Sequence, residues 1–213
     1  MSVEEIEFGS VETVRDAERL RPDRDRRFAV VPCGVPAEDD LPIFVALDAL
    51  RDMEAHALSE ARVELGGVLL GESCEDDRGM AFVTITDSLR ARHYESTSGS
   101  FKFTHETWAE FTRQRAGMGD GVQMVGWYHT HPNLGVFLSE LDRFICAHFF
   151  SRPSDVALVI DPCRQDRGFF QWSGLGPPQR TGGFYVFAPR HRTAELKCLV
   201  AFLELRWNAL SFF

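Results

Sequence analysis

Two histidines, His129 and His131, stand one residue apart at the end of an apolar run, and Pro132 follows them directly. Side chains on an extended backbone alternate between two faces, so both imidazoles point to the same side. Pro132 lacks a backbone N–H and has a fixed φ, so the strand cannot simply continue through it. The spacing predicts a pair of metal-ligand histidines at the end of a strand, followed by a turn.

Ser139 and Asp142 precede the apolar pair Phe144-Ile145, which is the pattern of a helix start with Ser139 at the N-cap. The Asp142 carboxylate can then reach back toward the histidines. Alone, this pattern is more often a plain capping box, and a His-x-His pair is common on ordinary strands. Two imidazoles and one carboxylate together are the three protein ligands of a catalytic zinc site. A structural zinc site would need a fourth protein ligand, and none lies nearby, because Cys146 is one turn further along the helix.

From His129 to Asp142 the sequence reads His-Thr-His-Pro, then six residues, Ser, two residues and Asp. This pattern resembles the JAMM motif of the MPN+ (JAB1/MPN/Mov34) metalloproteases, with no gap or substitution. The resemblance covers about residues 41 to 190. It implies that His129, His131 and Asp142 hold one catalytic Zn²⁺. It also implies that Glu64 acts on the water molecule and that Ser139 donates a hydrogen bond at the reacting carbonyl.

Glu64 is the one charged residue in the apolar run 63–70, which continues into the Gly-x-Leu-x-Gly pattern that the family places after its glutamate. A carboxylate in such a strand costs free energy unless something pairs with it. The alternative is that Glu64 lies at the strand end and faces water. The downstream histidine pair favours a carboxylate beside a metal site, and Gly66-Gly67 would let a substrate or a loop approach the backbone closely.

Length and charge limit the class of protein. A chain of 213 residues can bury a sizeable core, and we expect one domain plus extensions. The net charge of −9, from 32 acidic and 23 basic residues, argues against nucleic acid as a partner, because sequence-independent binding needs clustered Lys and Arg. The charge is explained most simply by solubility, and an acidic surface for a basic protein substrate is the alternative.

The cysteines and the hydropathy pattern predict a soluble cytoplasmic protein with no membrane partner. No secretory signal is visible at the N-terminus, and no apolar run approaches the ~18 residues of a membrane span. Five scattered cysteines without paired spacing suit reduced thiols. They are Cys33, Cys74, Cys146, Cys163 and Cys198.

Apolar periodicity predicts interleaved strands and helices. Strands are expected at 28–31, 43–47, 63–70, 81–86, 101–103, 122–128, 156–162, 169–172 and 184–187. Helices are expected at about 48–61, from Thr104, from Ser139 to about 150, and from Thr193, with loops at 88–100 and 174–179. This order predicts an α/β (α+β) fold with a mixed β-sheet flanked by helices. The resemblance implies the MPN/JAB fold, similar to the cytidine-deaminase-like three-layer sandwich.

The expected organisation has three parts. Residues 1–38 form a charged N-terminal extension, in which 1–27 is predicted to be a solvated arm or short helix rather than a packed element. Residues 39–190 form the JAB/MPN metalloprotease domain. Residues 191–213 form a C-terminal helix that packs on the domain or on a partner, as a homo- or hetero-oligomer, because it is apolar on more than one side.

Two further predictions concern side chains on helices. The helix that begins at Ser139 is expected to turn Ile145, Cys146 and Phe149 toward the core. His56 is expected to be a surface histidine or one satisfied within the protein, because it has no ligand partner one turn away.

The resemblance implies a zinc-dependent isopeptidase or peptidase that hydrolyses the bond after the C-terminus of a ubiquitin-like modifier. The modifier must come in trans, because no ubiquitin-like domain is visible in the sequence. Processing of a sulfur-carrier protein is one alternative, and a non-catalytic MPN scaffold subunit is another, although scaffolds lack the metal ligands present here. A deaminase fits poorly, since the His-x-Glu and Pro-Cys-x-x-Cys signature is absent.

Overall fold

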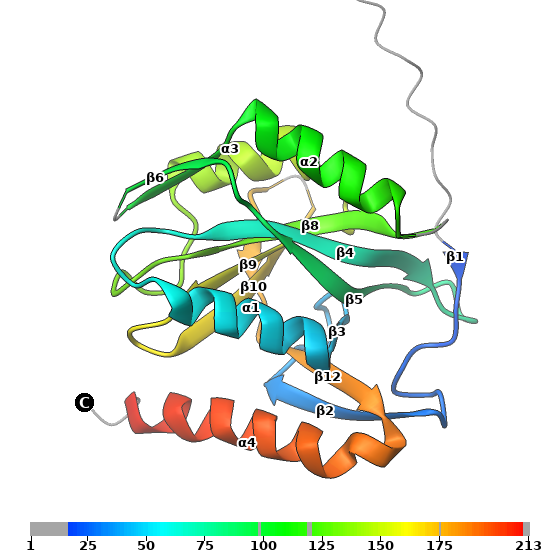
Figure 1. The fold of residues 1–213 in the computed structure, drawn as a ribbon. Helices are drawn as coiled ribbons and strands as arrows, with labels where there is room; N and C mark the ends of the chain where they lie inside the picture. The colour runs from blue at the N-terminus through cyan, green and yellow to red at the C-terminus, as the bar shows by residue number, and fades with distance from the viewer. Residues whose placement is uncertain (1–16, 98, 119–120, 175, 211–213) are drawn as a thin grey trace, which may run out of the picture.

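A curled mixed sheet forms the centre of the molecule (Figure 1). The computed structural model describes residues 17–97, 99–118, 121–174 and 176–210, with side chains described as far as Leu203 in the last helix. The strands of the sheet are β1 (Ala17–Glu18), β2 (Phe28–Gly34), β3 (Ile43–Ala46), β4 (Gly66–Glu75), β5 (Ala81–Arg90), β8 (Gln123–Thr130), β9 (Val156–Asp161), β10 (Asp166–Gln171), β11 (Gln179–Arg180) and β12 (Gly183–Pro189). Their order is β11-β10-β9-β8-β4-β5-β3-β12-β2, with β1 beside β4.

Helices cover both faces of this sheet, which confirms the predicted fold class (Figure 1). They are α1 (Leu47–Ser59), α2 (His105–Ala116), α3 (Glu140–Phe149) and α4 (Thr193–Leu210), the last preceded by the short 3₁₀ turn η1 (Arg190–Arg192). A separate hairpin consists of β6 (Tyr94–Thr97) and β7 (Ser100–Phe103). In Figure 1, α1 and α4 lie on one side of the sheet and α2 and α3 on the other.

Two apolar clusters fill the spaces between the sheet and its helices. Met53 of α1 and Leu196 of α4 belong to the first cluster, and Phe111 of α2 and Ile145 of α3 belong to the second. Large aliphatic and aromatic side chains are the main source of the free energy that stabilises such layers. The arrangement leaves β8 in the middle of the sheet, antiparallel to β4 and parallel to β9.

The prediction that 88–100 is a loop is wrong for most of that stretch. β5 continues as far as Arg90, and β6 begins at Tyr94. Ser88 is buried and pairs across the sheet with Leu69 of β4. Ladder hydrogen bonds with β4 keep the end of β5 extended, and those with β7 keep β6 extended, because the pairing outweighs the weak strand propensity of these polar residues.

Phe149 is also placed differently from the prediction, since the residue is 52% exposed. It stacks on Trp108 of α2 at a centroid distance of 5.0 Å and an interplanar angle of 14°. Phe150 leaves the helix with φ −134° and takes the buried position instead. The last apolar contact of α3 is therefore made with α2 at the surface, whereas Ile145 and Cys146 face the core as expected.

The described part of the N-terminal stretch packs against the sheet, contrary to the expectation of a solvated arm. β1 pairs in parallel with Cys74 and Glu75 of β4, and Arg24 forms an ion pair with Asp76 at 3.0 Å. β4 extends past its partner β8, which leaves an open edge that β1 covers. Residues 1–16 lie outside the described residues, so the assignment of 1–38 as an extension stays a prediction.

The C-terminal helix α4 packs on β2 and β12 through Leu196, Val200 and Leu203, which are buried. Residues 211–213 lie outside the described part, and the expected oligomer contact of this helix stays a prediction. Within the described residues, no helix combines the length and apolar character needed to cross a bilayer.

Candidate metal centre

β8 carries His129 near its end, and His131 follows the strand directly. Its side chains alternate between the two layers, with Trp127 in the cluster beneath α2 and α3 and Tyr128 in the cluster beneath α1. His129 stacks on Trp127 with ring centroids 4.3 Å apart. The Nε2 atoms of His129 and His131 lie 3.0 Å apart, so the sequence correctly indicated that both imidazoles turn to one side.

Asp142 reaches the histidines from the first turn of α3. A capping box fixes it, in which Asp142 N donates to Ser139 Oγ at 3.2 Å and Ser139 N donates to Asp142 Oδ2 at 2.7 Å. The carboxylate lies 3.4 Å from His129 Nε2, through Oδ1, and 3.5 Å from His131 Nε2, through Oδ2. The helix N-terminus thus orients the carboxylate toward both imidazoles.

The three side chains fit a zinc ion. Tetrahedral Zn²⁺ with bonds near 2.1 Å requires ligand atoms roughly 3.4 Å apart. The two Nε2 atoms are 3.0 Å apart, and each lies close to that distance from an oxygen of Asp142, Oδ1 for His129 and Oδ2 for His131, with one ligand atom from each of the three residues within 4.8 Å of the others. Two nitrogens with one oxygen are a zinc donor set. In the described part of the chain, one group of three or more His, Cys, Asp or Glu side chains lies close enough together to hold a metal ion. It consists of His129, His131 and Asp142.

The two imidazoles are oriented by different contacts. His131 Nδ1 lies 3.2 Å from Gly135 O, and since a carbonyl can only accept, Nδ1 carries the hydrogen and Nε2 offers its lone pair. His129 Nδ1 is buried and has no hydrogen-bond partner among the described residues. The ring of His129 is held instead by Trp127, whose indole N–H donates to Cys146 Sγ at 3.4 Å.

Glu64 lies beside this group, with Oε1 3.8 Å from His131 Nε2 and the residue only 2% exposed. It stands just before β4 rather than inside a strand, and the alternative that it faces water is wrong. Its backbone is held by the hairpin: Glu64 N donates to Thr97 O at 2.9 Å, and Ser96 Oγ donates to Glu64 O at 2.5 Å.

Gly66 and Gly67 are required by close contacts within the protein. A Cβ at Gly66 would lie 2.7 Å from the Phe101 ring of β7, and one at Gly67 would lie 2.2 Å from Leu89 O of β5. The close approach expected at this glycine pair is therefore made by neighbouring strands of the chain itself.

Burial and mutual charge shift the pKa values of the group. Burial raises the pKa of the Glu64 carboxyl to about 7, with His131 opposing the rise and Asp142 adding to it. Burial also acts to raise the pKa of Asp142, but the imidazoles and Ser139 outweigh it and hold that pKa well below its ordinary value. Burial lowers the pKa of His129, which favours the neutral form that a metal ligand needs. At His131, burial lowers the pKa, but Asp142 outweighs it and the net shift is upward.

Sequence reasoning missed three residues around the site. Thr130 and Gly135 lie within the recognised motif but act through hydrogen bonds to Leu65 and His131, which spacing alone does not reveal. Asp161 ends β9 as a carboxylate in an otherwise apolar run. That pattern, the same one that singled out Glu64, could have indicated it.

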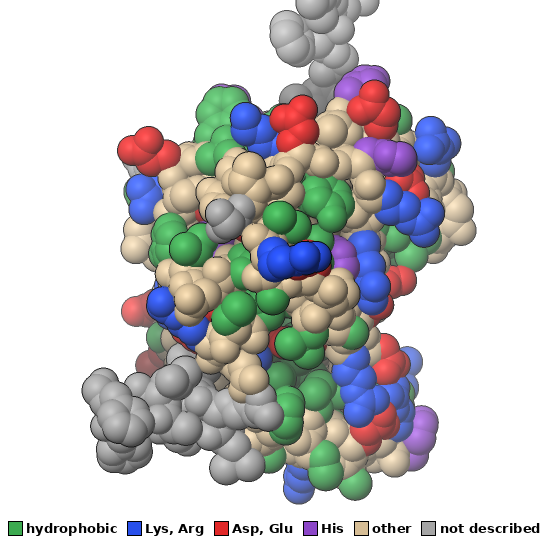
Figure 2. Space-filling view, turned by 60° about the vertical axis from the view of Figure 1, so that its left-hand side comes forward, with side chains coloured by type: hydrophobic (Ala, Val, Ile, Leu, Met, Phe, Trp, Pro, Cys, Tyr) green, Lys and Arg blue, Asp and Glu red, His purple; other side chains and the backbone are tan. Residues whose placement is uncertain are grey.

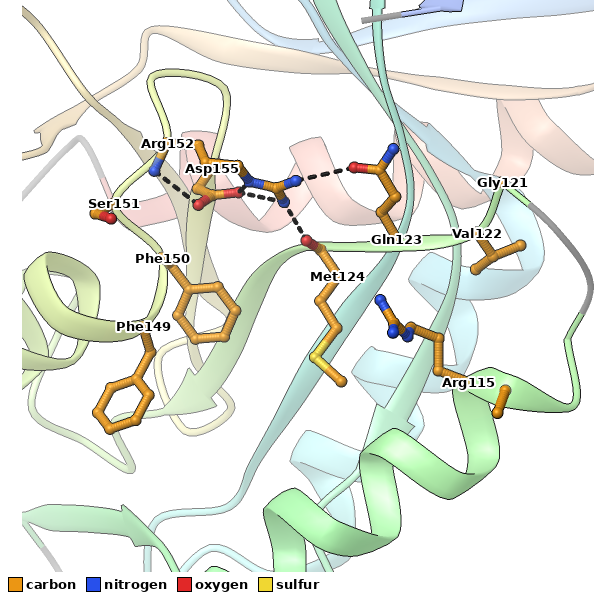
Figure 3. A pocket seen from close by; sticks show the side chains of 11 residues that line it. Arg115, Gly121, Val122, Gln123, Met124, Phe149, Phe150, Ser151, Arg152 and Asp155 are labelled. Carbon is orange, nitrogen blue, oxygen red and sulfur yellow. Dashed lines mark hydrogen bonds and ion pairs between the residues drawn. The ribbon is translucent and has the colours of Figure 1, made fainter. Parts of the chain in front are cut away.

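A cleft of about 710 Å³ lies elsewhere, at the end of β8 opposite to His129 and between the C-terminal ends of α2 and α3 (Figure 3). Arg152 lies at this cleft with its guanidinium bonded to Asp155, to Gln123 Oε1 at 2.9 Å and to Met124 O. Arg152 and Asp155 are thus paired with each other, and the cleft does not contain the candidate metal ligands.

Comparison with known proteins gives one family. A sequence model described as "JAB1/Mov34/MPN/PAD-1 ubiquitin protease" matches residues 42–149, just over half of the chain. The match includes Glu64, both histidines, Ser139 and Asp142.

Three curated relatives are similar to this chain over parts of their length. The STAM-binding protein of Rattus norvegicus is 34% identical over 37% of this chain and 19% of its own length. COP9 signalosome complex subunit 5 of Oryza sativa subsp. japonica is 30% identical over 54% and 32%. Ubiquitin carboxyl-terminal hydrolase RPN11 of Saccharomyces cerevisiae is 28% identical over 59% and 40%. The chain therefore spans less than half the length of each of these relatives.

Proposed function

Because this chain belongs to the JAB1/Mov34/MPN/PAD-1 ubiquitin protease family, we propose that it is a zinc-dependent hydrolase that cleaves the isopeptide or peptide bond after the C-terminus of a ubiquitin-like modifier. The modifier is bound in trans. The candidate ligands are His129, His131 and Asp142.

The observation that carries this proposal is the position of Glu64. Its carboxylate lies 3.8 Å from His131 Nε2 but outside the group of three that matches zinc geometry. Burying a carboxyl beside a second carboxylate costs free energy that a scaffold subunit would have no reason to retain. A metal site with an additional buried acid–base group is what hydrolysis requires, which supports an enzyme over the scaffold alternative.

When bound, zinc supplies a positive charge that lowers the pKa of a water molecule to about 7 and polarises a carbonyl. Glu64 is placed to accept the proton of the attacking water and to pass it to the leaving amine, so that the amide nitrogen departs protonated. Ser139 Oγ already accepts from Asp142 N, and its own O–H remains able to donate to the oxyanion of the reacting carbonyl.

The surroundings of the site suit an extended peptide. Leu134 and Phe137, in the loop after His131, are 43% and 45% exposed, and the Phe137 ring lies 4.7 Å from the His131 ring. Figure 2 brings forward the side on which the β6–β7 hairpin lies, and apolar side chains on it are interspersed with both basic and acidic ones. An apolar tail with a C-terminal backbone carbonyl fits this surface better than a highly charged ligand does.

The test is cleavage of modifier fusions by the purified chain. The substrates are ubiquitin-like proteins and sulfur-carrier proteins in two forms, one extended at the C-terminus by a reporter peptide and one linked through its C-terminus to a lysine side chain. Each substrate is incubated with the wild-type protein and with Glu64→Gln. We expect cleavage directly after one modifier's C-terminus, loss of that cleavage in Glu64→Gln, and its loss on chelation with recovery on zinc addition. Wild-type cleavage rates in Glu64→Gln would exclude Glu64 as the base, and cleavage of sulfur-carrier fusions alone would favour that alternative substrate.

A further inference from the structure

A second buried carboxylate, Asp161 at the end of β9, lies behind the candidate metal centre. It is 0% exposed and accepts four backbone N–H groups, from Asn133 at 3.0 Å, Gly135 at 2.8 Å, Cys163 at 3.0 Å and Arg164 at 3.0 Å. Hydrogen bonds between a carboxylate and backbone N–H groups are stronger than neutral ones and replace the lost hydration of the charge.

Both oxygens of Asp161 accept from the loop that leaves His131, and Oδ1 also accepts from the turn after β9. Oδ1 accepts from Asn133, Cys163 and Arg164, whereas Gly135 N is the one backbone donor to Oδ2 among the described residues. The carboxylate thereby joins the turn after β9 to the loop that leaves His131. That loop needs support at Asn133, whose φ of 62° lies in the left-handed region, whereas glycine at 135 adopts its φ of 91° without steric cost.

Gly135 connects this anchor to the metal centre. Its N–H donates to Asp161 Oδ2, and its carbonyl accepts from His131 Nδ1 at 3.2 Å. The position of that carbonyl decides both the orientation of the His131 ring and which nitrogen offers a lone pair. Groups that hold a ligating histidine in this way typically change metal affinity 10- to 100-fold when they are removed.

We propose that Asp161 is a positioning residue for the metal centre, which fixes His131 as a ligand through the Gly135 peptide. This inference rests on the proposed function in so far as that function requires the ion. The competing explanation is that Asp161 only stabilises two turns, in which case its loss would lower stability and leave metal affinity unchanged.

Asp161→Asn separates these explanations. An amide can keep its oxygen toward the three donors at the Oδ1 position, including Asn133 N, and its NH₂ group then faces the N–H of Gly135, so the bond to Gly135 is the backbone hydrogen bond that is lost. The ion pair between Arg164 Nε and Oδ2, at 3.6 Å, is lost with it, as the ion pair with Arg24 is lost in the control variant described next. Asp76→Asn is the matched control. Asp76 is 3% exposed, accepts Arg78 N at 2.9 Å and Met80 N at 3.0 Å, and follows the end of β4 remote from Gly66, which pairs with His129.

The readouts are zinc affinity, measured by competition with a chromophoric chelator, and the visible absorption of the Co²⁺-substituted protein. We expect 10- to 100-fold weaker zinc binding and an altered Co²⁺ spectrum in Asp161→Asn, with wild-type values in Asp76→Asn. Equal affinities and spectra in the two variants would overturn the positioning role. Absence of zinc binding in the wild type would instead contradict the proposed function, so the two failures are distinguishable.

A measurement on the zinc-loaded wild type covers the case in which Asp161→Asn does not fold. We expect the Gly135 amide proton to exchange slowly, and the Nδ1 proton of His131 to be detectable by ¹⁵N-edited NMR. A Gly135 amide that exchanges as fast as an unprotected loop, or an Nδ1 of His131 without a proton, would contradict the inference.

Discussion

Thr130 and Leu65 are joined by two hydrogen bonds: Thr130 N donates to Leu65 O at 2.8 Å, and Leu65 N donates to Thr130 Oγ1 at 2.8 Å. Thr130 stands between the two histidines, and Leu65 directly follows Glu64. The residues are 65 positions apart in the chain. This paired contact therefore holds the candidate base at a fixed position relative to the candidate metal ligands.

Thr130→Val removes one of these bonds while keeping the side-chain shape. Leu65 N–H is then left buried without its acceptor, which costs about 1–3 kcal/mol, and Glu64 is free to shift. Misplacement of a catalytic group by about 1 Å can lower a rate roughly 100-fold. We expect kcat to fall about 10- to 100-fold with zinc content unchanged, as measured by fusion cleavage and elemental analysis.

Thr130→Ser is the matched control, because it loses a methyl group but keeps the hydroxyl oxygen. Its kcat should stay within about threefold of the wild type. Equal losses of kcat in the Val and Ser variants would mean that the hydroxyl does not position Glu64.

Ser139→Ala should affect stability and catalysis separately. Loss of the N-cap oxygen costs about 1 kcal/mol, and loss of an oxyanion donor costs about 100-fold or more in kcat. Thr104→Ala provides the comparison, because Thr104 caps α2 by accepting from Thr107 N and lies outside the metal centre. Urea unfolding should give similar losses for both variants, whereas only Ser139→Ala should lose activity. A Thr104→Ala variant as inactive as Ser139→Ala would attribute the effect to helix capping.

His56 provides a pH-dependent stability term away from the metal centre. It is buried in α1, and its Nδ1 lies 2.8 Å from Tyr128 Oη, so it is a satisfied histidine as the sequence suggested. Burial lowers its pKa from 6.5 to about 4, with Arg90 adding to the effect and Asp52 opposing it. Between pH 6.5 and pH 4 His56 is protonated in the unfolded chain but not in the folded protein. The stability that neutral His56 provides is therefore fully present above pH 6.5 and is lost as the pH falls toward 4.

Urea unfolding at pH 7.5 and pH 5 tests this term. We expect His56 to contribute at most about 2 kcal/mol to the loss of stability between pH 7.5 and pH 5, and less where solvent screens the charge. We expect His56→Gln to be less stable than the wild type at pH 7.5 but to lose correspondingly less stability on acidification. Parallel losses in the two proteins would show that His56 is already protonated in the folded state, or that its proton affinity is not altered by folding.

Local pattern was sufficient for most of the fold and for the group of three candidate ligands. The period-two spacing and Pro132 fixed how the histidines leave β8, and the Ser139 capping box fixed the direction of Asp142. These relations act over a few residues. The polar end of β5 depends on pairing with β4, and β6 of the hairpin after it pairs with β7 and bonds to Glu64, whereas propensity alone predicted a loop there.

The supporting contacts could not be predicted for the same reason. Leu65 bonds to Thr130, and Gly135 bonds to Asp161, through backbone groups that every residue possesses. Only the register of β4, β8 and β9 decides which groups meet. The resemblance pointed to Glu64, but its contact with the hairpin required the structure.

Binding of one zinc ion by His129, His131 and Asp142, with Glu64 beside it, is measured by elemental analysis after dialysis of the wild type, Glu64→Gln and His129→Ala. We expect about one zinc per chain in the wild type and in Glu64→Gln, and loss of zinc in His129→Ala, with all three folded by circular dichroism. If a folded wild type retained no zinc when supplied with it, or if His129→Ala retained as much as the wild type, these residues would not form a zinc site.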